Sequence, residues 1–295
     1  PQAMAGAFAP RGKLSLAAPL FSQQADEGRV LSAAMRIGFV SHVYSALLDD
    51  GTLARTARVL SVAGGTSERD LFTAIGLNNA VISNLDTIEA SAQLEPFEWA
   101  HQDAQHLSYG DKSFDWVVVV DGLHHCTSPH RALTEMYRVC RIGVIVVEAR
   151  DSALMRLAVR TGMSSEYELE AVIHQEGRSG GLENGPVPNH VYRWTEAEFE
   201  KTIRSCDPTG DHKFRYFNGL NLPYETAALR GWGRKAVLLK VADPLMRLFT
   251  AAFKKQCNSI AMVATRPETL WPWLEEVDGD LEFRNPLRSG EAGDR

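Results

Sequence analysis

Hydrophobic and polar positions alternate in blocks along the first half of the chain, and the blocks predict alternating helices and strands. Between about residues 30 and 48, apolar side chains recur at helical spacing. Short apolar runs typical of strands follow, separated by polar or amphipathic stretches. The predicted strands cover residues 58–62, 80–85, 97–101, 117–120 and 143–148. Because the run 117–120 consists of valines alone, we expect a parallel sheet that has this strand at its centre and helices over both faces.

The second half of the chain predicts two more strands and two insertions. Strand patterns cover residues 214–217 and 259–264, and helix patterns cover 128–140, 151–161, 166–175 and the stretch after Thr195. Residues 176–188 are rich in glycine, which is typical of a mobile lid. The segment 220–257 has apolar positions for one or two helices. Its apolar face can pack on the sheet, line an acceptor pocket, rest on a membrane surface or form a homodimer contact.

These patterns predict one main domain over residues 29–267. Within it, residues 150–195 form a lid or substrate insertion and residues 220–257 a helical insertion. Residues 1–28 are rich in Ala, Pro, Gly and Gln, so we expect a flexible arm there. Residues 268–295 predict a polar tail in which Trp271 and Trp273 are local anchors.

Composition narrows the class of protein. The chain has 295 residues with 31 Lys and Arg against 37 Asp and Glu, a formal charge of −6, and 44% hydrophobic residues. These values are typical of a globular protein and do not favour a nucleic-acid partner. The chain has no run of 18 uninterrupted apolar residues, so we expect no integral membrane segment. Four scattered cysteines without a CxxC pair predict reduced thiols in a cytoplasmic protein, with neither a disulfide framework nor a zinc site.

Polar and glycine residues follow the predicted strands at the points where ligands bind in α/β sheets. The first strand runs into the turn Ala63-Gly64-Gly65, where small residues let backbone N–H groups approach a ligand, although a tight turn without a ligand looks the same. Asp86 follows the second strand about 20 residues later. An acidic residue there can hold ribose hydroxyls or cap the next helix.

The stretch from Asp103 to His125 carries the pattern DAxxLxxxDxSFDxVVxxxxLHH. With the Gly-rich turn upstream, it resembles the class I S-adenosylmethionine-dependent methyltransferases, in the branch of small-molecule, lipid and quinone methyltransferases. The resemblance covers roughly residues 55–150 and continues more loosely to about 265. It implies a Rossmann-like, doubly wound α/β fold with a seven-stranded sheet. That sheet is mostly parallel, and its last strand is antiparallel between the fifth and sixth.

The resemblance also implies S-adenosylmethionine as cofactor and a set of residues around it. Ala63, Gly64 and Gly65 would lie under the methionine part, and Asp86 would hold the ribose. Asp103 would face the adenine amine beside the Ala104 backbone, and Asp121 and Leu123 would lie near the sulfonium.

The first motif departs from the family pattern. Ser61 stands where an acidic residue is usual, Ala63 where the first glycine is usual, and Ser67 at the third small position. Glu68 or Asp70 on the following helix can supply the missing carboxylate. A methyltransferase fold that has lost catalysis is the alternative that these changes leave open.

Candidate catalytic groups lie on both sides of the expected cleft. A general base for a hydroxyl acceptor would come from His124, His125, Glu170 or His190, and Tyr192 and Arg193 would contact the acceptor. On the predicted helix 166–175, Glu166, Glu170 and His174 share one face, which can bind a metal, act as a base or simply face solvent.

The sequence therefore predicts a cytoplasmic biosynthetic enzyme that methylates a small-molecule acceptor. The leading expectation is O-methylation of a hydroxyl on a glycan, glycolipid or secondary metabolite, without a bound metal. One alternative is C-methylation of an apolar or prenylated acceptor, with Glu170 removing the proton. The other is an inactive scaffold.

Overall fold

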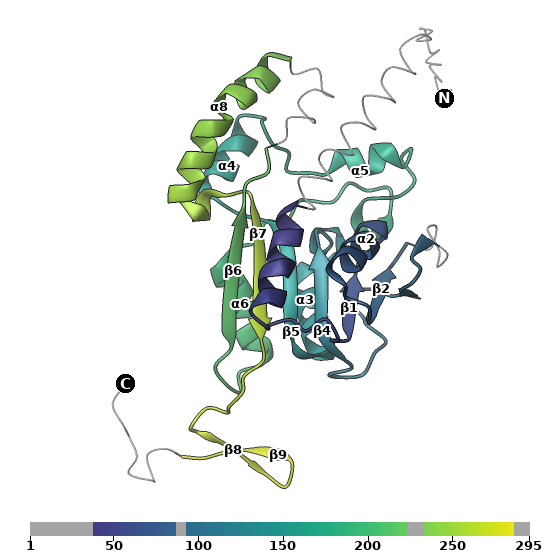
Figure 1. The fold of residues 1–295 in the computed structure, drawn as a ribbon, viewed down its shortest axis with the longest axis vertical. Coiled ribbons are helices and arrows are strands. Elements are labelled where there is room, and N and C mark those ends of the chain that lie inside the picture. The colour runs from purple at the N-terminus through teal and green to yellow at the C-terminus, as the bar shows by residue number, and fades with distance from the viewer. Residues whose placement is uncertain (1–37, 87–92, 223–232, 286–295) are drawn as a thin grey trace, which may run out of the picture.

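The computed structural model describes residues 38–86, 93–222 and 233–285, so the predicted N-terminal arm lies outside the described residues. Seven strands form one sheet in the order β3-β2-β1-β4-β5-β7-β6 (Figure 1). Their bounds are β1 Val59–Val62, β2 Ala80–Asn84, β3 Glu98–His101, β4 Phe114–Val120, β5 Cys140–Ala149, β6 Lys213–Gly219 and β7 Ser259–Thr265. β7 is antiparallel to both neighbours, β5 and β6. The predicted fold class and strand arrangement are confirmed.

Alternate residues of the central strand point to opposite sides of the sheet, so its valines make both faces apolar. Helices cover both faces and bury these side chains. On one face, Val117 and Val119 of β4 pack in a core with α3 (Pro129–Val139) and α6 (Glu196–Cys206). On the other, Val118 packs with α2 (Thr66–Ile75) and the helical residues 38–49. All three valines are at most 1% exposed. A strand buried on both faces at the centre of the sheet was predicted from the valine run.

Two helix starts are fixed by side-chain caps. The Ser128 side chain accepts a hydrogen bond from Arg131 N at 3.3 Å, and Pro129 takes the first helical position of α3. Thr195 caps α6 in the same way through Glu198 N at 3.2 Å. Both helices therefore begin where a side-chain oxygen satisfies a backbone N–H group.

The insertion between β5 and α6 contains α4 (Ala153–Arg160), α5 (Leu169–His174) and the short 3-10 helix η3 (Leu182–Asn184). The predicted helix 166–175 is too long, because residues 166–168 lie before α5 and pair with residues 189–191. Glu168 N donates to Asn189 O at 3.0 Å, and Val191 N donates to Glu166 O at 2.8 Å. Since Glu166 lies before α5, the predicted helix face of Glu166, Glu170 and His174 is wrong.

The second insertion contains α8 (Gly233–Ala252) and the 3-10 helix η4 (Lys254–Gln256). Val241, Leu245 and Leu248 of α8 are each about 70% exposed. Whether this surface meets an acceptor, a membrane or a second copy stays a prediction. Among the described helices, none combines the length and the apolar character needed to cross a bilayer.

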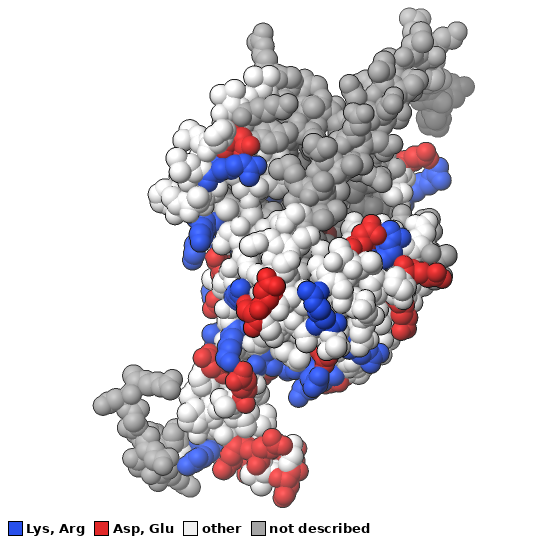
Figure 2. Space-filling view, in the orientation of Figure 1, with Lys and Arg blue, Asp and Glu red and all other residues white. Residues whose placement is uncertain are grey.

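The C-terminal region is a hairpin where the sequence predicts only a polar tail, so that prediction is incomplete. β8 (Leu274–Val277) pairs antiparallel with β9 (Asp280–Phe283) through Asp278-Gly279, both at positive φ. An Asp-Gly pair between short strands is a hairpin pattern that we missed. The Trp271 and Trp273 rings stack at 5.0 Å before it. Figure 2 shows acidic side chains gathered on this hairpin (Glu275, Glu276, Asp278, Asp280 and Glu282).

Candidate active site

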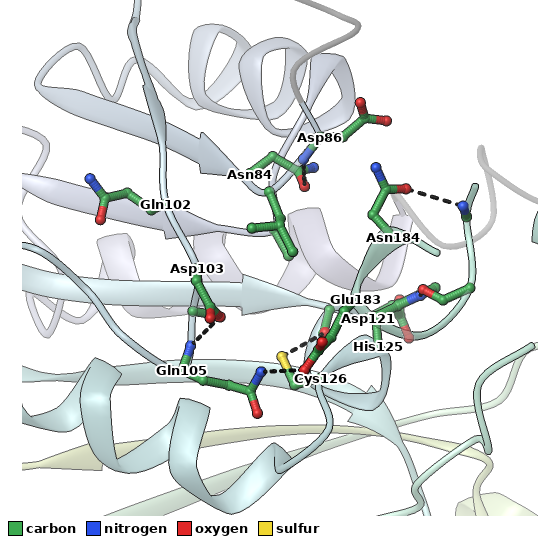
Figure 3. A pocket seen from close by; sticks show the side chains of 16 residues that line it. Asn84, Asp86, Gln102, Asp103, Gln105, Asp121, His125, Cys126, Glu183 and Asn184 are labelled. Carbon is green, nitrogen blue, oxygen red and sulfur yellow. Dashed lines mark hydrogen bonds between the residues drawn. The ribbon is translucent and has the colours of Figure 1, made fainter. Parts of the chain in front are cut away.

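A cavity of 210 Å³ lies at the carboxyl ends of the parallel strands. Figure 3 shows side chains from the strand ends around it, among them Asp86, Asp103 and Asp121, together with Glu183 and Asn184 of the insertion. Ligands bind at this edge of open α/β sheets because the strand-to-helix loops converge there. The cavity is therefore the candidate binding site, and the insertion forms one of its walls.

Backbone geometry at two strand ends brings the loops after β1 and β4 together. Ala63 and Asp121 both have φ 51°, a left-handed conformation that is rare for residues other than glycine. A Cβ on Gly122 would lie 2.6 Å from the Ala63 Cβ, so only glycine allows the two turns this close. Ala63, Asp121 and Gly122 all line the cavity. Strained residues held by their surroundings are typical of functional sites.

The Gly-rich turn after β1 receives a carboxylate from the next helix. Glu68 Oε2 accepts a hydrogen bond from Gly65 N at 2.7 Å. Ser61, at the unusual first position, is fully buried, and its Oγ has no hydrogen-bond partner among the described residues. Asp70 is exposed instead and pairs with Arg69. Of the two predicted substitutes, Glu68 is thus the one at the turn, and its role toward the cofactor stays a prediction.

The loops after β2 and β3 place the two carboxylates predicted to hold a nucleoside. The Asn84 side chain links two loops, since it accepts from Asp86 N at 3.1 Å and donates to Gly64 O at 3.0 Å. Asp103 Oδ1 accepts from Gln105 N at 2.8 Å, which fixes its turn. Asp86, Asp103, Ala104 and Asp121 line one cavity as the resemblance implies, whereas Leu123 is fully buried.

Next to the cavity, two histidines and two glutamates form a hydrogen-bonded cluster. His124 Nδ1 lies 2.7 Å from Glu148 Oε2, and His124 Nε2 lies 3.2 Å from Glu168 Oε2. His125 Nε2 lies 3.4 Å from the same Glu168 oxygen. Glu148 also accepts from Leu123 N at 2.7 Å, which ties the end of β5 to the 3-10 helix η2 (Leu123–His125). The cluster joins the sheet to the insertion.

The two histidines of this cluster differ in charge. Burial alone would lower the pKa of His124, but Glu148 and Glu168 outweigh burial and raise it to about 10. Burial, followed by the nearby charge of His124, lowers the pKa of His125 below its ordinary value. Although burial opposes the change, the hydrogen bond and charge of His124 lower the pKa of Glu168 to about 2. At neutral pH, His124 is therefore held as a cation, and His125 is neutral.

The Gly-rich loop of the insertion lines the cavity and is held in place by side-chain hydrogen bonds. Glu183 accepts hydrogen bonds from Gln105 Nε2 at 3.3 Å and from the Thr127 hydroxyl. Asn184 Oδ1 accepts from Gly180 N at 3.1 Å, as Figure 3 shows. A Cβ on Gly181 would lie 2.0 Å from Val187 O. Glycine at position 181 therefore allows a tight turn, and a few polar contacts hold the loop in place.

The other predicted residues lie apart from the cavity lining. His190 is exposed and packs on the Tyr167 ring at 5.5 Å. Tyr192 donates to Glu198, and Arg193 Nη2 donates to Ser165 O at 2.7 Å. A second cavity of 710 Å³ lies near Tyr167, with Val159, Arg160, Ser164, Leu169 and Pro188 around it. Roles for Glu170, His190, Tyr192 and Arg193 toward an acceptor stay predictions.

Glu148 and Glu168 are the cluster members that the sequence analysis does not select. Glu148 ends the fifth strand, and the carboxyl end of a buried strand is a place where a carboxylate is costly unless it has a partner. A glutamate at the end of a buried strand is therefore a pattern from which Glu148 could have been selected. Glu168 falls within the predicted helix 166–175 but not on the face of Glu166, Glu170 and His174, and its contact with His124 spans 44 residues of sequence. No local pattern could have indicated this contact.

Comparisons with known proteins agree with this geometry. Residues 51–147 match the family described as a methyltransferase domain. A phosphatidylethanolamine N-methyltransferase from Cereibacter sphaeroides is 32% identical over 139 residues, which are 40% of this chain and 68% of that protein. The ubiquinone/menaquinone biosynthesis C-methyltransferase UbiE from Roseobacter denitrificans is 27% identical over 135 residues, 42% of this chain and 54% of that protein. The chain thus spans about half the length of this second relative.

Among solved structures, the complex between a Haloferax volcanii methyltransferase activator and a candidate methyltransferase contains a similar fold. The similarity has a TM-score of 0.51 at 13% identity and covers 84% of this chain and 96% of the matched chain. At this identity the similarity concerns the fold alone.

Proposed function

Because the chain belongs to the class I S-adenosylmethionine-dependent methyltransferases, we propose that it transfers the methyl group of this donor to a small-molecule acceptor. The membership confirms the predicted family and methyl donor. The observation that carries the proposal is the single cavity that collects Asp86, Asp103 and Asp121 from three strand ends, opposite the insertion. Its residues fit the donor, since carboxylates at these positions can accept hydrogen bonds from ribose hydroxyls and amines.

The donor, when bound, supplies an activated methyl group, so the protein mainly has to position two molecules. Asp86, Asp103 and Asp121 would hold the donor, and the bound donor would supply its methyl group to an acceptor oxygen in exchange for the proton of the acceptor hydroxyl. The cavity would have to hold donor and acceptor in line, and the Gly-rich loop that lines it would limit the access of water. A hydroxyl acceptor also loses a proton, which needs a base.

His125 is the predicted base that the geometry favours. It lines the cavity, and its lowered pKa keeps it neutral near pH 7. His124 has a carboxylate at each ring nitrogen and is held as a cation, so it is suited to position Glu168 rather than to accept a proton. In this proposal the acceptor proton passes to His125 Nε2, with Glu168 stabilising the charge that forms. O-methylation of a hydroxyl is therefore the leading reaction.

C-methylation is the second candidate, and the name of one relative favours it. UbiE is a C-methyltransferase of ubiquinone and menaquinone biosynthesis, and the other relative is named for N-methylation of phosphatidylethanolamine. Both named substrates combine an apolar part with a polar one. Incubation with deuterated-methyl donor and a panel of quinone, phospholipid and glycolipid acceptors, followed by NMR of the product, would identify the methylated atom.

Calorimetric titration with S-adenosylhomocysteine tests the donor site directly. We expect micromolar binding to the wild type and its loss in Asp86→Ala, because the variant lacks the carboxylate predicted to hold the ribose. Asp211→Ala is the matched control, since Asp211 is 70% exposed and contacts Arg204. No binding to the wild type would show that the changed first motif has closed the site, and the scaffold alternative would then hold.

A further inference from the structure

Three ligand-type atoms meet at one point beside the cavity. His124 Nε2 and His125 Nε2 lie 3.2 and 3.4 Å from the same oxygen, Glu168 Oε2. The ring centroids of the two histidines are 4.7 Å apart. All three atoms lie within 4.8 Å of one another. Two imidazoles and one carboxylate therefore meet at one point.

The other nitrogen of each imidazole is already held by an oxygen. His124 Nδ1 lies 2.7 Å from Glu148 Oε2, and His125 Nδ1 lies 3.4 Å from Gly181 O. A carboxylate and a carbonyl oxygen only accept hydrogen bonds, so each Nδ1 can carry its proton. A metal ion would displace the second proton of the His124 cation, and each Nε2 would then present a lone pair. Metal-bound histidines show this arrangement, with a carboxylate or carbonyl fixing the tautomer. Asn189 Nδ2, 3.3 Å from Glu168 Oε2, holds the carboxylate as well.

We propose that His124 Nε2, His125 Nε2 and Glu168 Oε2 bind one divalent transition-metal ion. Ligands about 2.0–2.1 Å from zinc lie about 3.0–3.4 Å apart when they are neighbours in octahedral or tetrahedral geometry. The two N···O distances of 3.2 and 3.4 Å already have this length. A set of two histidines and one glutamate leaves further coordination positions open, as catalytic zinc sites do.

Charge and access also fit a cation at this point. The carboxyl groups of Glu148 and Glu168 both face His124, so a divalent ion that displaces the second His124 proton would meet acidic groups on two sides. The His124 side chain is 7% exposed, whereas those of His125 and Glu168 are about one-third exposed. The ion can therefore enter from the insertion side. One lone pair on His125 Nε2 cannot both bind an ion and accept a proton, so an ion at this point would displace His125 from its proposed role as base. Metal binding is therefore tested separately from methyl transfer.

Calorimetry of the full chain, purified without a histidine tag and stripped with EDTA, tests the site with ZnCl2 and then MnCl2. We expect one zinc ion per chain with micromolar or tighter affinity. Glu168→Gln and His125→Ala should each weaken binding by more than about 100-fold, and Glu148→Gln by about 10- to 100-fold, because Glu148 only orients a ligand. Glu166→Gln is the control, an exposed carboxylate two residues from Glu168.

Cysteine is the competing ligand, because Cys126 follows His125 and lines the cavity. Zinc binding that survives in Cys126→Ser and is lost in Glu168→Gln supports the proposal. Loss in Cys126→Ser with full binding in Glu168→Gln overturns it, as does failure of the wild type to bind either ion. S-adenosylhomocysteine titrations of the same preparations, with thermal melts, report donor binding and folding separately. A failure of the metal site is thus distinguishable from a failure of the donor site.

Discussion

The cavity has two walls that are built in different ways. The wall made by the strand ends belongs to the sheet, and its shape follows from backbone geometry such as the left-handed Ala63 and Asp121. The wall made by the insertion, residues 150–195, leans on the core through side chains of Glu168 and Glu183. One wall is fixed by the fold itself, and the other is fastened by a small number of polar contacts.

Burial shows the same difference. The strands behind the first wall are largely buried, and β4 and β5 contribute many fully buried side chains. In the insertion, by contrast, Leu157, Ile173 and Val187 are each more than half exposed. Regions with few buried apolar contacts open at low free-energy cost. We call the wall made by the strand ends the donor wall. We infer that the donor wall is rigid and that the insertion is the part that moves to admit ligands.

The size of the cavity supports this inference. Its 210 Å³ is below the roughly 300–1,000 Å³ typical of small-molecule sites. Donor and acceptor therefore require the Gly-rich loop to open. The following predictions each alter one wall or the junction between the two.

Removing the carboxylate at the junction should have the largest effect. Glu148→Ala leaves His124 buried with one partner and leaves Leu123 N without its acceptor. Breaking a buried ion pair costs about 3–5 kcal/mol of unfolding free energy. Urea unfolding in EDTA would measure the loss, and Glu148→Gln should lose less because the amide oxygen can still accept from Leu123 N. A loss below about 1 kcal/mol for Glu148→Ala would contradict a stabilising role for this pair.

A methyl group inside the sheet tests the rigid wall. In Gly143→Ala the new Cβ would lie 2.2 Å from Ala264 O and 2.9 Å from Trp116 Cζ3, so β5 and β7 must separate locally. Overpacking of this kind costs about 1–3 kcal/mol or more. Gly65→Ala is the matched control, since nothing lies within 4 Å of its new Cβ. Equal unfolding midpoints in urea for the two variants would show that the sheet accommodates the added methyl group as easily as the turn does.

The donor wall is also the part that the sequence predicts well. Strand periodicity, the valine run and the Asp103–His125 pattern depend on neighbouring residues, and the sheet positions them with little freedom. Asp86, Asp103 and Asp121 therefore lie together in the structure as the sequence analysis expects. The order of β5, β7 and β6 came from the resemblance, because periodicity alone does not give strand order.

The insertion is predicted less well, for a physical reason. The stretch 166–168 has residues that suit a helix, but pairing with residues 189–191 holds it outside α5. That pairing sets Glu168 toward His124, a contact between distant parts of the chain. Helical periodicity cannot indicate it, since tertiary hydrogen bonds overrode a weak local preference. The sequence therefore did not predict the cluster of His124, His125 and Glu168.

Loosening the insertion should change ligand exchange more than stability. Glu183→Ala removes the hydrogen bonds from Gln105 and Thr127 that fasten the loop. We expect S-adenosylhomocysteine to associate and dissociate about 3- to 10-fold faster, with under about 1 kcal/mol lost from unfolding free energy. Stopped-flow tryptophan fluorescence would measure both rates. Glu176→Ala is the control, since Glu176 is 74% exposed and pairs with Arg178; unchanged rates in both variants would mean that the loop does not gate the cavity.

The smallest effect is expected at Glu135, which supports the loop after β3 on the donor wall. Its carboxylate accepts from Leu107 N at 3.1 Å and from Arg138, and Arg138 also donates to Leu107 O and Tyr109 O. The Arg138 hydrogen bond lowers the pKa of Glu135 below its ordinary value. A carboxylate whose folded pKa is lowered stabilises the protein above its unfolded pKa, and this stabilisation disappears as the pH falls.

Glu135→Gln keeps an acceptor for Leu107 N and removes only the charge. At pH 7 we expect it to lower the unfolding free energy by less than about 1 kcal/mol, because Arg138 is partly exposed. The difference from the wild type should shrink as the pH falls below about 4.5, since the wild-type carboxylate then becomes protonated. Urea unfolding at pH 7 and pH 3.5 would measure it. A difference that stays constant between the two pH values would show that Glu135 acts through its shape and hydrogen bonds, and that charge adds nothing to this wall.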